Sequence, residues 1–263
     1  MHAEIIAIGD EITSGRLLDT NTQWLSQRLE EMGIRVLYHS TVADELEPCA
    51  EVFRRGRKPT VGITASKTTI ILRIAAEGAT EEACYAAMEP TIATIRECLG
   101  TLVFGQDDEE LQDAVVRLLR QQKKTLATVE WGTAGMVAGW LDGVPEANGY
   151  YLGGLVTPVD ATLQNVLGIE ADLLAKHASA GREMVVAMAA GCRRRFHSDY
   201  GLAVGRFPEF NASSREPKRV FIALADVDGV QVESFPFTGD PALLKIYSAK
   251  RALDLARLVM LGE

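Results

Sequence analysis

Adjacent carboxylates at Asp10 and Glu11 are the first side chains in this sequence whose types could do chemistry. They follow a strand-like run at residues 4–8. Carboxylate oxygens are ligands that hard divalent cations prefer, so the pair is a weak candidate for a metal site. Two neighbouring acids after a strand are more typical of a solvated loop or a helix cap. We expect the second arrangement.

A second candidate is the turn at residues 129–135, V-E-W-G-T-A-G, which joins an expected strand to an expected helix at 133–141. The N–H groups of a helix N-terminus attract anions, so Thr133 and Gly135 could hold part of a nucleotide. Alternatively, Thr133 caps the helix and Gly135 allows strand and turn to pack closely. The turn contains no lysine or histidine that could activate the Thr133 hydroxyl as a nucleophile.

Cysteines and arginines give weaker signals. Cys49, Cys84, Cys98 and Cys192 are scattered without a C-x-x-C pair, which indicates structural thiols rather than disulfides or zinc ligands. Three arginines at 193–195 end an expected helix, and Arg206 follows the next expected strand. These arginines could meet a phosphate, although a basic helix end is more typical of charges that complement the helix dipole.

Composition excludes several classes of protein. The chain has 263 residues, of which 47% are hydrophobic, enough for a core in two or three compact units. Its formal net charge of -9 opposes a phosphate backbone, so we expect no nucleic-acid partner. No run approaches the roughly 20 apolar residues of a spanning helix, and no secretory leader precedes the first strand. We therefore expect no membrane association and a cytoplasmic location.

Hydrophobic periodicity divides the chain into three units. Residues 1–56 read as strand 4–8, helix 22–32 and strand 34–42. Residues 57–105 read as two β runs at 61–66 and 68–78, a helix at 80–99 and a last short strand at 102–105. The carboxylates at 107–110 are expected on the first turn of the next helix.

Residues 106–263 alternate between helices and strands, which predicts a three-layer α/β domain. Strands are expected at 125–130, 150–157, 201–205, 219–227 and 230–237. Helices are expected up to 122 and at 133–141, 160–167, 171–177, 179–196 and 241–261.

Three blocks of the sequence, in the same order, resemble the CinA family of competence/damage-inducible proteins. The block AEIIAIGDEITSGRLLDTNTQWLSQRLEEMGIRVLYHSTVADE resembles the start of its molybdopterin-binding-like domain. PTVGITASKTTIILRIAAEGATEEA, followed by TLVFGQDDEEL, is similar to its KH-type domain. LDGVPEANGYYLGGLVT, VLGI, REMVVAMAAG and a late TGD resemble its C-terminal nicotinamide mononucleotide amidohydrolase domain.

The resemblance implies an α/β protein built from three parts: a βαβ fragment of the molybdopterin-binding-like domain, a small α+β KH-type domain and a three-layer α/β C-terminal domain. It also implies a homodimer, and we expect no cofactor. The centre of the first domain, with its G-G-L-G-P-T block, has no counterpart between residue 55 and the KH-type block. The remaining βαβ fragment cannot bury both faces of its sheet alone, so the KH-type unit or a second subunit is expected to cover it.

The amidohydrolase motifs depart from the family at their reactive positions. In the family motif A-E-S-C-T-G-G a serine attacks the nicotinamide carboxamide, and here Trp131 takes its place. In T-Y-S-N-E-A-K the tyrosine and lysine positions hold Pro158 and Leu163, which cannot exchange protons. The T-G-x-A-G-P loop is replaced by residues 205–208, G-R-F-P, which lack its glycine density. The nucleophile, the base and the anion cradle are therefore all expected to be missing.

Several family positions are nevertheless kept, and they are the candidate substrate-binding residues together with Arg206: Glu130, Thr133, Gly135, Gly153, Gly154 and Thr157. One interpretation is a residual nucleotide pocket, and the other is a scaffold that needs these residues for folding. The first hypothesis for function is a non-catalytic CinA-like protein that binds a ligand or partner. The alternatives are an active deamidase that uses other groups, and a nucleic-acid module, which the absence of a G-x-x-G loop disfavours.

Overall fold

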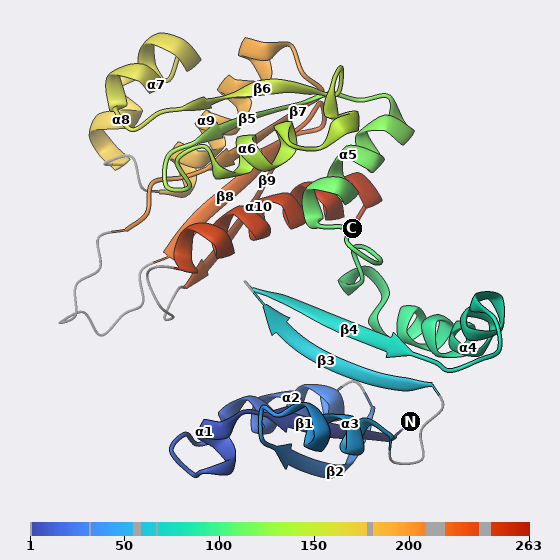
Figure 1. Cartoon of the computed structure of the whole chain (residues 1–263). Helices are drawn as coiled ribbons and strands as arrows, with labels where there is room; N and C mark the ends of the chain where they lie inside the picture. Colours follow the sequence, from blue (N-terminus) through green and yellow to red (C-terminus); the bar gives the residue numbers. More distant parts are fainter. Residues whose placement is uncertain are drawn as a thin grey trace. The chain divides into compact units, whose positions relative to one another are not determined.

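The computed structural model describes residues 2–31, 33–54, 59–66, 68–177, 181–208, 219–236 and 243–263. The TGD segment at 238–240, the start of the helix expected at 241 and Lys67 lie outside the described residues. The chain divides into two compact units, residues 1–103 and 104–263, which we describe separately (Figure 1). In the described part of the chain, no helix has the length and apolar character needed to cross a membrane.

The first unit opens with the expected βαβ arrangement. Its elements are β1 (His2–Ile8), α1 (Asp10–Thr13), α2 (Thr20–Glu31), β2 (Arg35–Val42) and α3 (Leu46–Arg54). β1 pairs with β2 in parallel. The Asp19 carboxylate caps α2 by accepting the Thr22 N–H at 2.8 Å, and the Ser26 hydroxyl of α2 lies 2.9 Å from His39 Nε2 on β2.

An antiparallel β-ribbon and one long helix follow in the first unit. β3 (Thr60–Ser66) pairs with β4 (Thr69–Ala75), and α4 (Glu81–Leu99) begins where Thr80 accepts the Ala83 N–H at 3.2 Å. The strand expected at 102–105 is wrong. The chain instead makes a 3₁₀ turn, η1 (Gly100–Leu102), because the positive φ of 51° at Gly100 ends the helix, and an irregular segment follows.

The second unit is built on a five-stranded sheet with the strand order β6-β5-β7-β8-β9. β5, β6 and β7 are parallel, whereas β8 and β9 are antiparallel to their neighbours. The strands are β5 (Leu126–Glu130), β6 (Tyr151–Val156), β7 (Tyr200–Val204), β8 (Arg219–Ala225) and β9 (Val230–Pro236). The helices are α5 (Leu111–Gln122), α6 (Met136–Asp142), η2 (Pro145–Ala147), α7 (Asp160–Leu167), α8 (Ala171–His177), α9 (Arg182–Phe196) and α10 (Leu244–Leu261).

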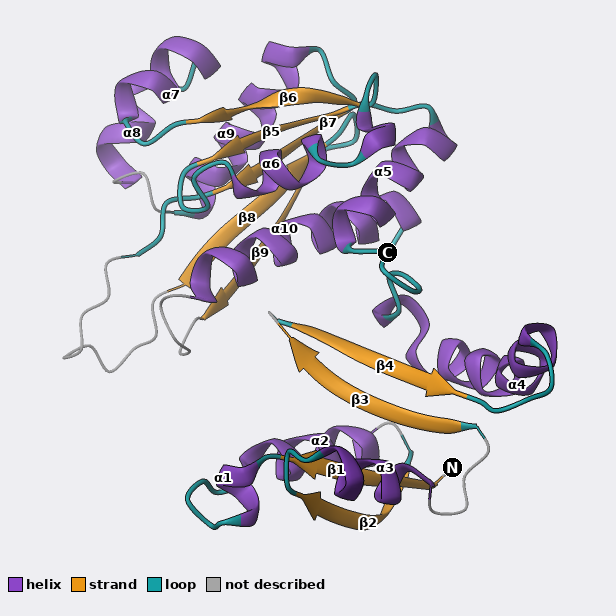
Figure 2. Ribbon diagram, in the orientation of Figure 1, coloured by secondary structure: helices purple, strands orange, loops and turns teal. Residues whose placement is uncertain are grey.

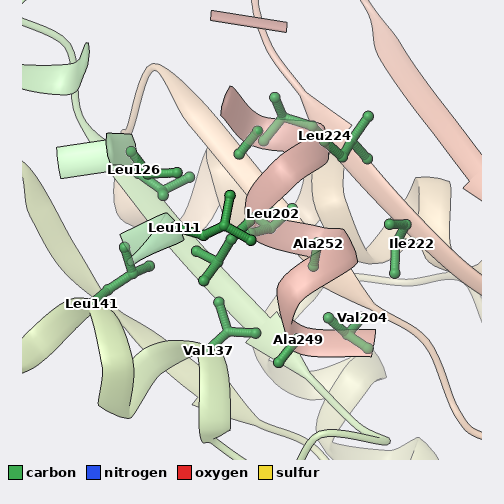
Figure 3. Packing of buried hydrophobic residues seen from close by; sticks show 14 of the residues in the cluster. Leu111, Leu126, Val137, Leu141, Leu202, Val204, Ile222, Leu224, Ala249 and Ala252 are labelled. Atoms are coloured by element: carbon green, nitrogen blue, oxygen red, sulfur yellow. The ribbon is translucent and has the colours of Figure 1, made fainter. Parts of the chain in front are cut away.

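Helices cover both faces of this sheet, which confirms the three-layer α/β architecture (Figure 2). On one face, α5, α6 and α10 pack against side chains such as Leu126, Leu202 and Ile222 (Figure 3). On the other face, α7, α8 and α9 pack against the alternate strand residues, such as Val129 and Ala203. We call these two clusters the α5/α6/α10 core and the α7/α8/α9 core.

The acidic run at 107–110 does not lie on the first turn of α5, as expected. The helix begins at Leu111, and Glu110 precedes it in a capping box with Asp113. The Glu110 side chain therefore accepts an N–H group of the first turn from just outside the helix, and Asp113 within that turn accepts the Glu110 N–H at 2.9 Å.

β5 occupies the topological switch point of the sheet. From β5 the chain crosses one face through α6 to reach β6, and from β6 it crosses the other face through α7–α9 to reach β7 on the opposite side of β5. Crevices for ligands form outside the carboxyl ends of strands at such a point. We therefore expect a ligand site, if the unit has one, at the carboxyl ends of β5, β6 and β7.

Candidate functional site

Backbone hydrogen bonds join the three loops that leave β5, β6 and β7. The N–H of Trp131 donates to the Val204 carbonyl at 3.0 Å, and the N–H of Thr157 donates to the Glu130 carbonyl at 2.9 Å. Gly132 and Gly205 are joined by a third bond of 3.1 Å. Of the residues expected to form a site, Glu130, Trp131 and Thr157 are thus brought together at one edge of the sheet.

The Glu130 side chain is buried beneath this edge and caps α6. Only 1% of its surface is exposed. Its Oε2 accepts the Thr133 hydroxyl at 2.5 Å and the N–H groups of Gly135 and Val137 at 3.1 Å each, and its Oε1 accepts the Ala138 N–H at 2.7 Å. One carboxylate therefore satisfies four donors that would otherwise be unpaired at the start of the helix.

The expectation that Thr133 caps a helix beginning at its own position is wrong. α6 begins at Met136, and the Thr133 hydroxyl donates to Glu130 rather than accepting from the helix. Ala134 and Gly135 intervene with positive φ values of 55° and 91°. The longer Glu130 side chain, anchored on β5, performs the capping because this left-handed turn brings the helix N–H groups to its carboxylate.

Trp131, at the family's nucleophile position, takes part in the packing of the turn. Its indole is half-buried and packs against the α7/α8/α9 core. The Arg206 guanidinium lies over the ring, 5.5 Å from its centroid. A cation over an indole face is attracted by the ring's quadrupole, so Arg206 interacts with Trp131 as a cation–π pair.

The positions corresponding to the family's lysine and tyrosine lie in opposite environments. Leu163, on α7, is fully buried within the α7/α8/α9 core, the same cluster that Trp131 contacts. Pro158 is exposed in the loop before α7. Neither position offers a group that can accept or donate a proton in the reaction.

Phe207 is a residue of this site that the sequence did not single out. A Cβ atom built on Gly132 would overlap the Phe207 ring, and the ring also packs against the α5/α6/α10 core. The aromatic side chains of Trp131 and Phe207 therefore both pack at this turn. The glycine at position 132, directly after Trp131, was the sequence feature that could have indicated a side chain packed closely against the backbone.

Gly153 and Gly154 serve the packing of β6. A Cβ on Gly154 would overlap Thr128 Oγ1 and lie 2.6 Å from the Tyr151 hydroxyl, and these two hydroxyls are hydrogen-bonded at 2.8 Å. Gly153 has a φ of 118°, and a Cβ there would lie 3.5 Å from the Phe196 ring. The close contacts at Gly154 and the positive φ of Gly153 are features that the scaffold interpretation of the two glycines requires.

Burial raises the pKa of Tyr151 to about 12, against an opposing hydrogen bond from Thr128. Because its folded pKa lies above the unfolded value near 10, the tyrosine's contribution to stability should be complete below about pH 10 and lost as the pH rises through 12. We expect phenolate absorbance at about 295 nm, measured as wild type minus Tyr151→Phe, to appear with a midpoint near 12. A midpoint near 10 would contradict the buried placement.

Thr157 is the one expected site residue that retains an unsatisfied polar group in the described part of the chain. It is completely buried at the end of β6, and its Oγ1 has no hydrogen-bond partner among the described residues. Buried hydroxyls are normally paired with protein or water, so this atom marks a place where a water or a ligand atom would be stabilised.

Asp10 and Glu11 are both exposed at the start of α1. Asp10 Oδ1 accepts the Asp44 N–H at 3.1 Å, which links α1 to the loop after β2. In the described ranges, no three His, Cys, Asp or Glu side chains are grouped so that they could hold a metal ion.

Three family models match the chain. The CinA C-terminal domain matches residues 108–260, the probable molybdopterin binding domain matches 4–66, and the damage-inducible protein CinA KH domain matches 38–105. A CinA-like protein of Prochlorococcus marinus is 34% identical over 226 residues, covering 84% of this chain and 52% of its own length. One from Acaryochloris marina is 28% identical over 251 residues, covering 92% of this chain and 58% of its own. The chain thus spans about half the length of these curated relatives.

Solved structures agree with the fold. A CinA superfamily protein from Klebsiella pneumoniae is 24% identical with a TM-score of 0.55, covering 60% of this chain and all of its own. The competence/damage inducible protein CihA from Agrobacterium tumefaciens is 22% identical with a TM-score of 0.53, covering 61% of this chain and 99% of its own. Since the model of the CinA C-terminal domain covers more than half of the sequence, the chain belongs to the CinA family.

Proposed function

We propose that this CinA-like protein derives from the nicotinamide-nucleotide amidohydrolases of pyridine nucleotide salvage, and that it does not catalyse amide hydrolysis. It acts instead as a binding or structural homologue in the cytoplasm. Its three parts would be a fragment at 1–56, a KH-type domain at 57–105 and an amidohydrolase-like domain at 106–263.

The observation that carries this proposal is the shared packing of Trp131 and Leu163. Leu163 belongs to the α7/α8/α9 core, and the Trp131 indole packs against the same core. These are the two positions at which the family motifs carry a base and a nucleophile. An amide carbon must approach a nucleophilic atom to about 3 Å, and a base must reach the proton released. Apolar packing at both positions supplies neither function.

An active deamidase is the alternative, and the Thr133–Glu130 pair favours it. A hydroxyl that donates to a carboxylate at 2.5 Å has the geometry of a nucleophile with its base. Against this role, Thr133 is only 2% exposed and the carboxylate also accepts three backbone N–H groups. The Thr133 hydroxyl is therefore not accessible to a substrate, as the alternative would require.

Ammonia release from nicotinamide mononucleotide decides between the two. We expect the purified chain to release no more ammonia than a mock preparation that lacks it. Release above this blank that disappears in Thr133→Val and persists in Thr133→Ser would establish the alternative, because serine keeps the hydroxyl. Release that is unchanged in Thr133→Val would contradict the non-catalytic proposal and also the role of Thr133 as nucleophile. Another nucleophile would then be required.

A residual nucleotide site is compatible with the non-catalytic proposal. The unpaired Thr157 hydroxyl and the Arg206 guanidinium near Trp131 are the groups that support it. Nicotinamide mononucleotide should then change the fluorescence of Trp131, and Trp131→Phe should remove that change. If calorimetry detects no binding at millimolar nucleotide, the protein is structural rather than ligand-binding.

A further inference from the structure

A cavity of about 230 Å³ lies between the end of α9 and the turn that joins β8 to β9. In the antiparallel register, Ala225 at the end of β8 lies opposite Gly201 at the start of β7. The cavity is therefore at the amino end of β7, whereas the candidate site lies at its carboxyl end. The lining contains no residue of the loops that leave β5, β6 and β7.

Small side chains form the apolar part of the lining. Ala225 is 2% exposed and belongs to the α7/α8/α9 core, and Ala190 and Val230 pack against the same core. Val227, which also lines the cavity, is 76% exposed, so the cavity opens to solvent. A small aliphatic group would be stabilised against this part of the lining, because it would leave water there.

The positive charges of the lining come from the last turns of α9. Ala190, Arg193 and Arg194 are spaced by three and four residues, so they share one face of the helix. Arg193 Nε donates to the Asp199 carbonyl at 3.0 Å, which leaves the two terminal nitrogens of the guanidinium to bind a ligand. The exposed Arg194 side chain makes no hydrogen bond or ion pair with any residue that the structure describes.

The negative charges come from the turn between β8 and β9. Asp226 Oδ1 accepts the N–H groups of Asp228 and Gly229 at 2.9 Å each, which fixes the turn. Within the described ranges, Asp226 Oδ2 and both oxygens of the Asp228 carboxylate have no hydrogen-bond partner. The carboxylates of the lining thus lie on the turn, and the guanidinium groups lie on the helix.

These opposite charges line one cavity without pairing with one another. Among the described residues, neither Arg193 nor Arg194 makes an ion pair with Asp226 or Asp228, although all four line the same space. Their formal charges sum to zero. A lone anion such as phosphate would be attracted by the arginines and repelled by the aspartates, and a lone cation would meet the reverse. A molecule that carries both charges would be attracted by both pairs.

We propose that this cavity binds a small zwitterion, an α-amino acid with an aliphatic side chain such as valine. The carboxylate of the ligand pairs with the two arginines, its ammonium group pairs with the two aspartates, and its side chain packs against Ala225 and its apolar neighbours. The proposal does not depend on whether the C-terminal unit hydrolyses amides, because the site is at the other edge of the sheet.

The affinity should be low. The cavity is smaller than the roughly 300–1,000 Å³ of pockets for drug-sized ligands, and salt screens charges that are open to solvent. We expect L-valine to bind with a dissociation constant of about 1 mM at low ionic strength, and more weakly at high salt.

Titration of the full chain with matched probes tests the zwitterion directly. L-Valine should shift the backbone amide resonances of Asp228 and Gly229 in nitrogen–proton correlation spectra, because both N–H groups are bonded to Asp226. Isobutylamine lacks the carboxylate of valine and isovalerate lacks its ammonium group. Each should bind at least about tenfold more weakly, a loss of about 1.4 kcal/mol.

Three results of the titration would overturn the proposal. Isovalerate or inorganic phosphate binding as tightly as valine would identify an anion site. Isobutylamine binding as tightly as valine would identify a cation site. Unchanged Asp228 and Gly229 resonances at about 20 mM valine would show that the cavity binds no amino acid of this class.

Arg194→Gln and Asp228→Asn each remove one charge from opposite sides of the cavity. Both side chains are exposed, so neither change should affect folding. Each variant should bind valine about tenfold more weakly, because a hydrogen bond to a charged group is lost. Arg194→Gln should not weaken the binding of isobutylamine, which has no carboxylate for Arg194 to contact.

Arg195→Gln is the matched control, because Arg195 is the next residue of α9, is exposed and does not line the cavity. It should bind valine as the wild type does. Wild-type affinity for valine in both Arg194→Gln and Asp228→Asn would refute the assignment to this cavity. An equal loss in Arg195→Gln would also refute it, since the general charge of the helix end would then account for binding.

Discussion

Replacing Glu130 with alanine is expected to lower the free energy of unfolding of the C-terminal unit by about 4 kcal/mol, because several donors lose their acceptor at once. The change removes the acceptor for the Thr133 hydroxyl and three helix N–H groups, all at a position that is 1% exposed. Glu130→Gln should cost less, since its amide oxygen can keep the three bonds made by Oε2. Urea unfolding followed by fluorescence, in a Trp24→Phe background that confines the signal to this unit, measures both.

The matched control for Glu130 is Glu146→Ala, an exposed carboxylate in the same unit. A surface change of this kind should stay within about 0.5 kcal/mol of the wild type. If Glu130→Ala were equally mild, the cap that Glu130 makes on α6 would not contribute to the stability of the unit.

Replacing Leu163 with lysine, the residue that the family motif carries there, should destabilise the C-terminal unit by about 3 kcal/mol or more at pH 7. The ammonium would enter a fully buried apolar cluster, which lowers the pKa of the new lysine. Since that folded pKa lies below the unfolded value near 10.4, the loss should be largest at neutral and lower pH and should shrink as the pH rises toward 10. Urea unfolding at pH 7 and pH 9.5 measures the difference.

Leu163→Met, which keeps the volume and the apolar character, should cost less than about 1.5 kcal/mol. Should Leu163→Lys prove as stable as Leu163→Met at pH 7, position 163 would face a polar space. The proposal of a non-catalytic core at this position would then be wrong. The two variants therefore test the functional proposal through stability, independently of any turnover measurement.

Much of the C-terminal fold follows from the sequence because its physics is local. Val129 and Ala203 point to one face of the sheet and Leu126 and Leu202 to the other, and β5 and β6 are each followed by a helix. Apolar residues on both faces of a strand indicate a sheet that is covered on both faces. The strand at 102–105 could not be excluded in this way, because its apolar residues give no sign that Gly100 would turn the chain out of a sheet.

The details of the candidate site were less accessible because they depend on contacts between distant segments. Thr133 is a good capping residue by type, but Glu130, three residues earlier on a strand, is held closer to the helix N–H groups by the left-handed turn at Ala134 and Gly135. Phe207 lies in a loop far along the sequence, so the closeness of its ring to Gly132 is visible only once β5 and β7 are paired. The positions of Trp131, Pro158 and Leu163 in the motifs were assigned by resemblance, and the structure adds their surroundings.

The buried cap at Glu130 also makes position 131 separable from the folding of the turn. The backbone of Trp131 is fixed by Val204, and the start of α6 is fixed by Glu130, so neither anchor uses the indole. A protein engineer could therefore exchange the side chain at 131 while the loop around it keeps its course. Position 131 is therefore a place where a serine, a cysteine or an unnatural nucleophile could be introduced without changing the backbone anchors of the turn.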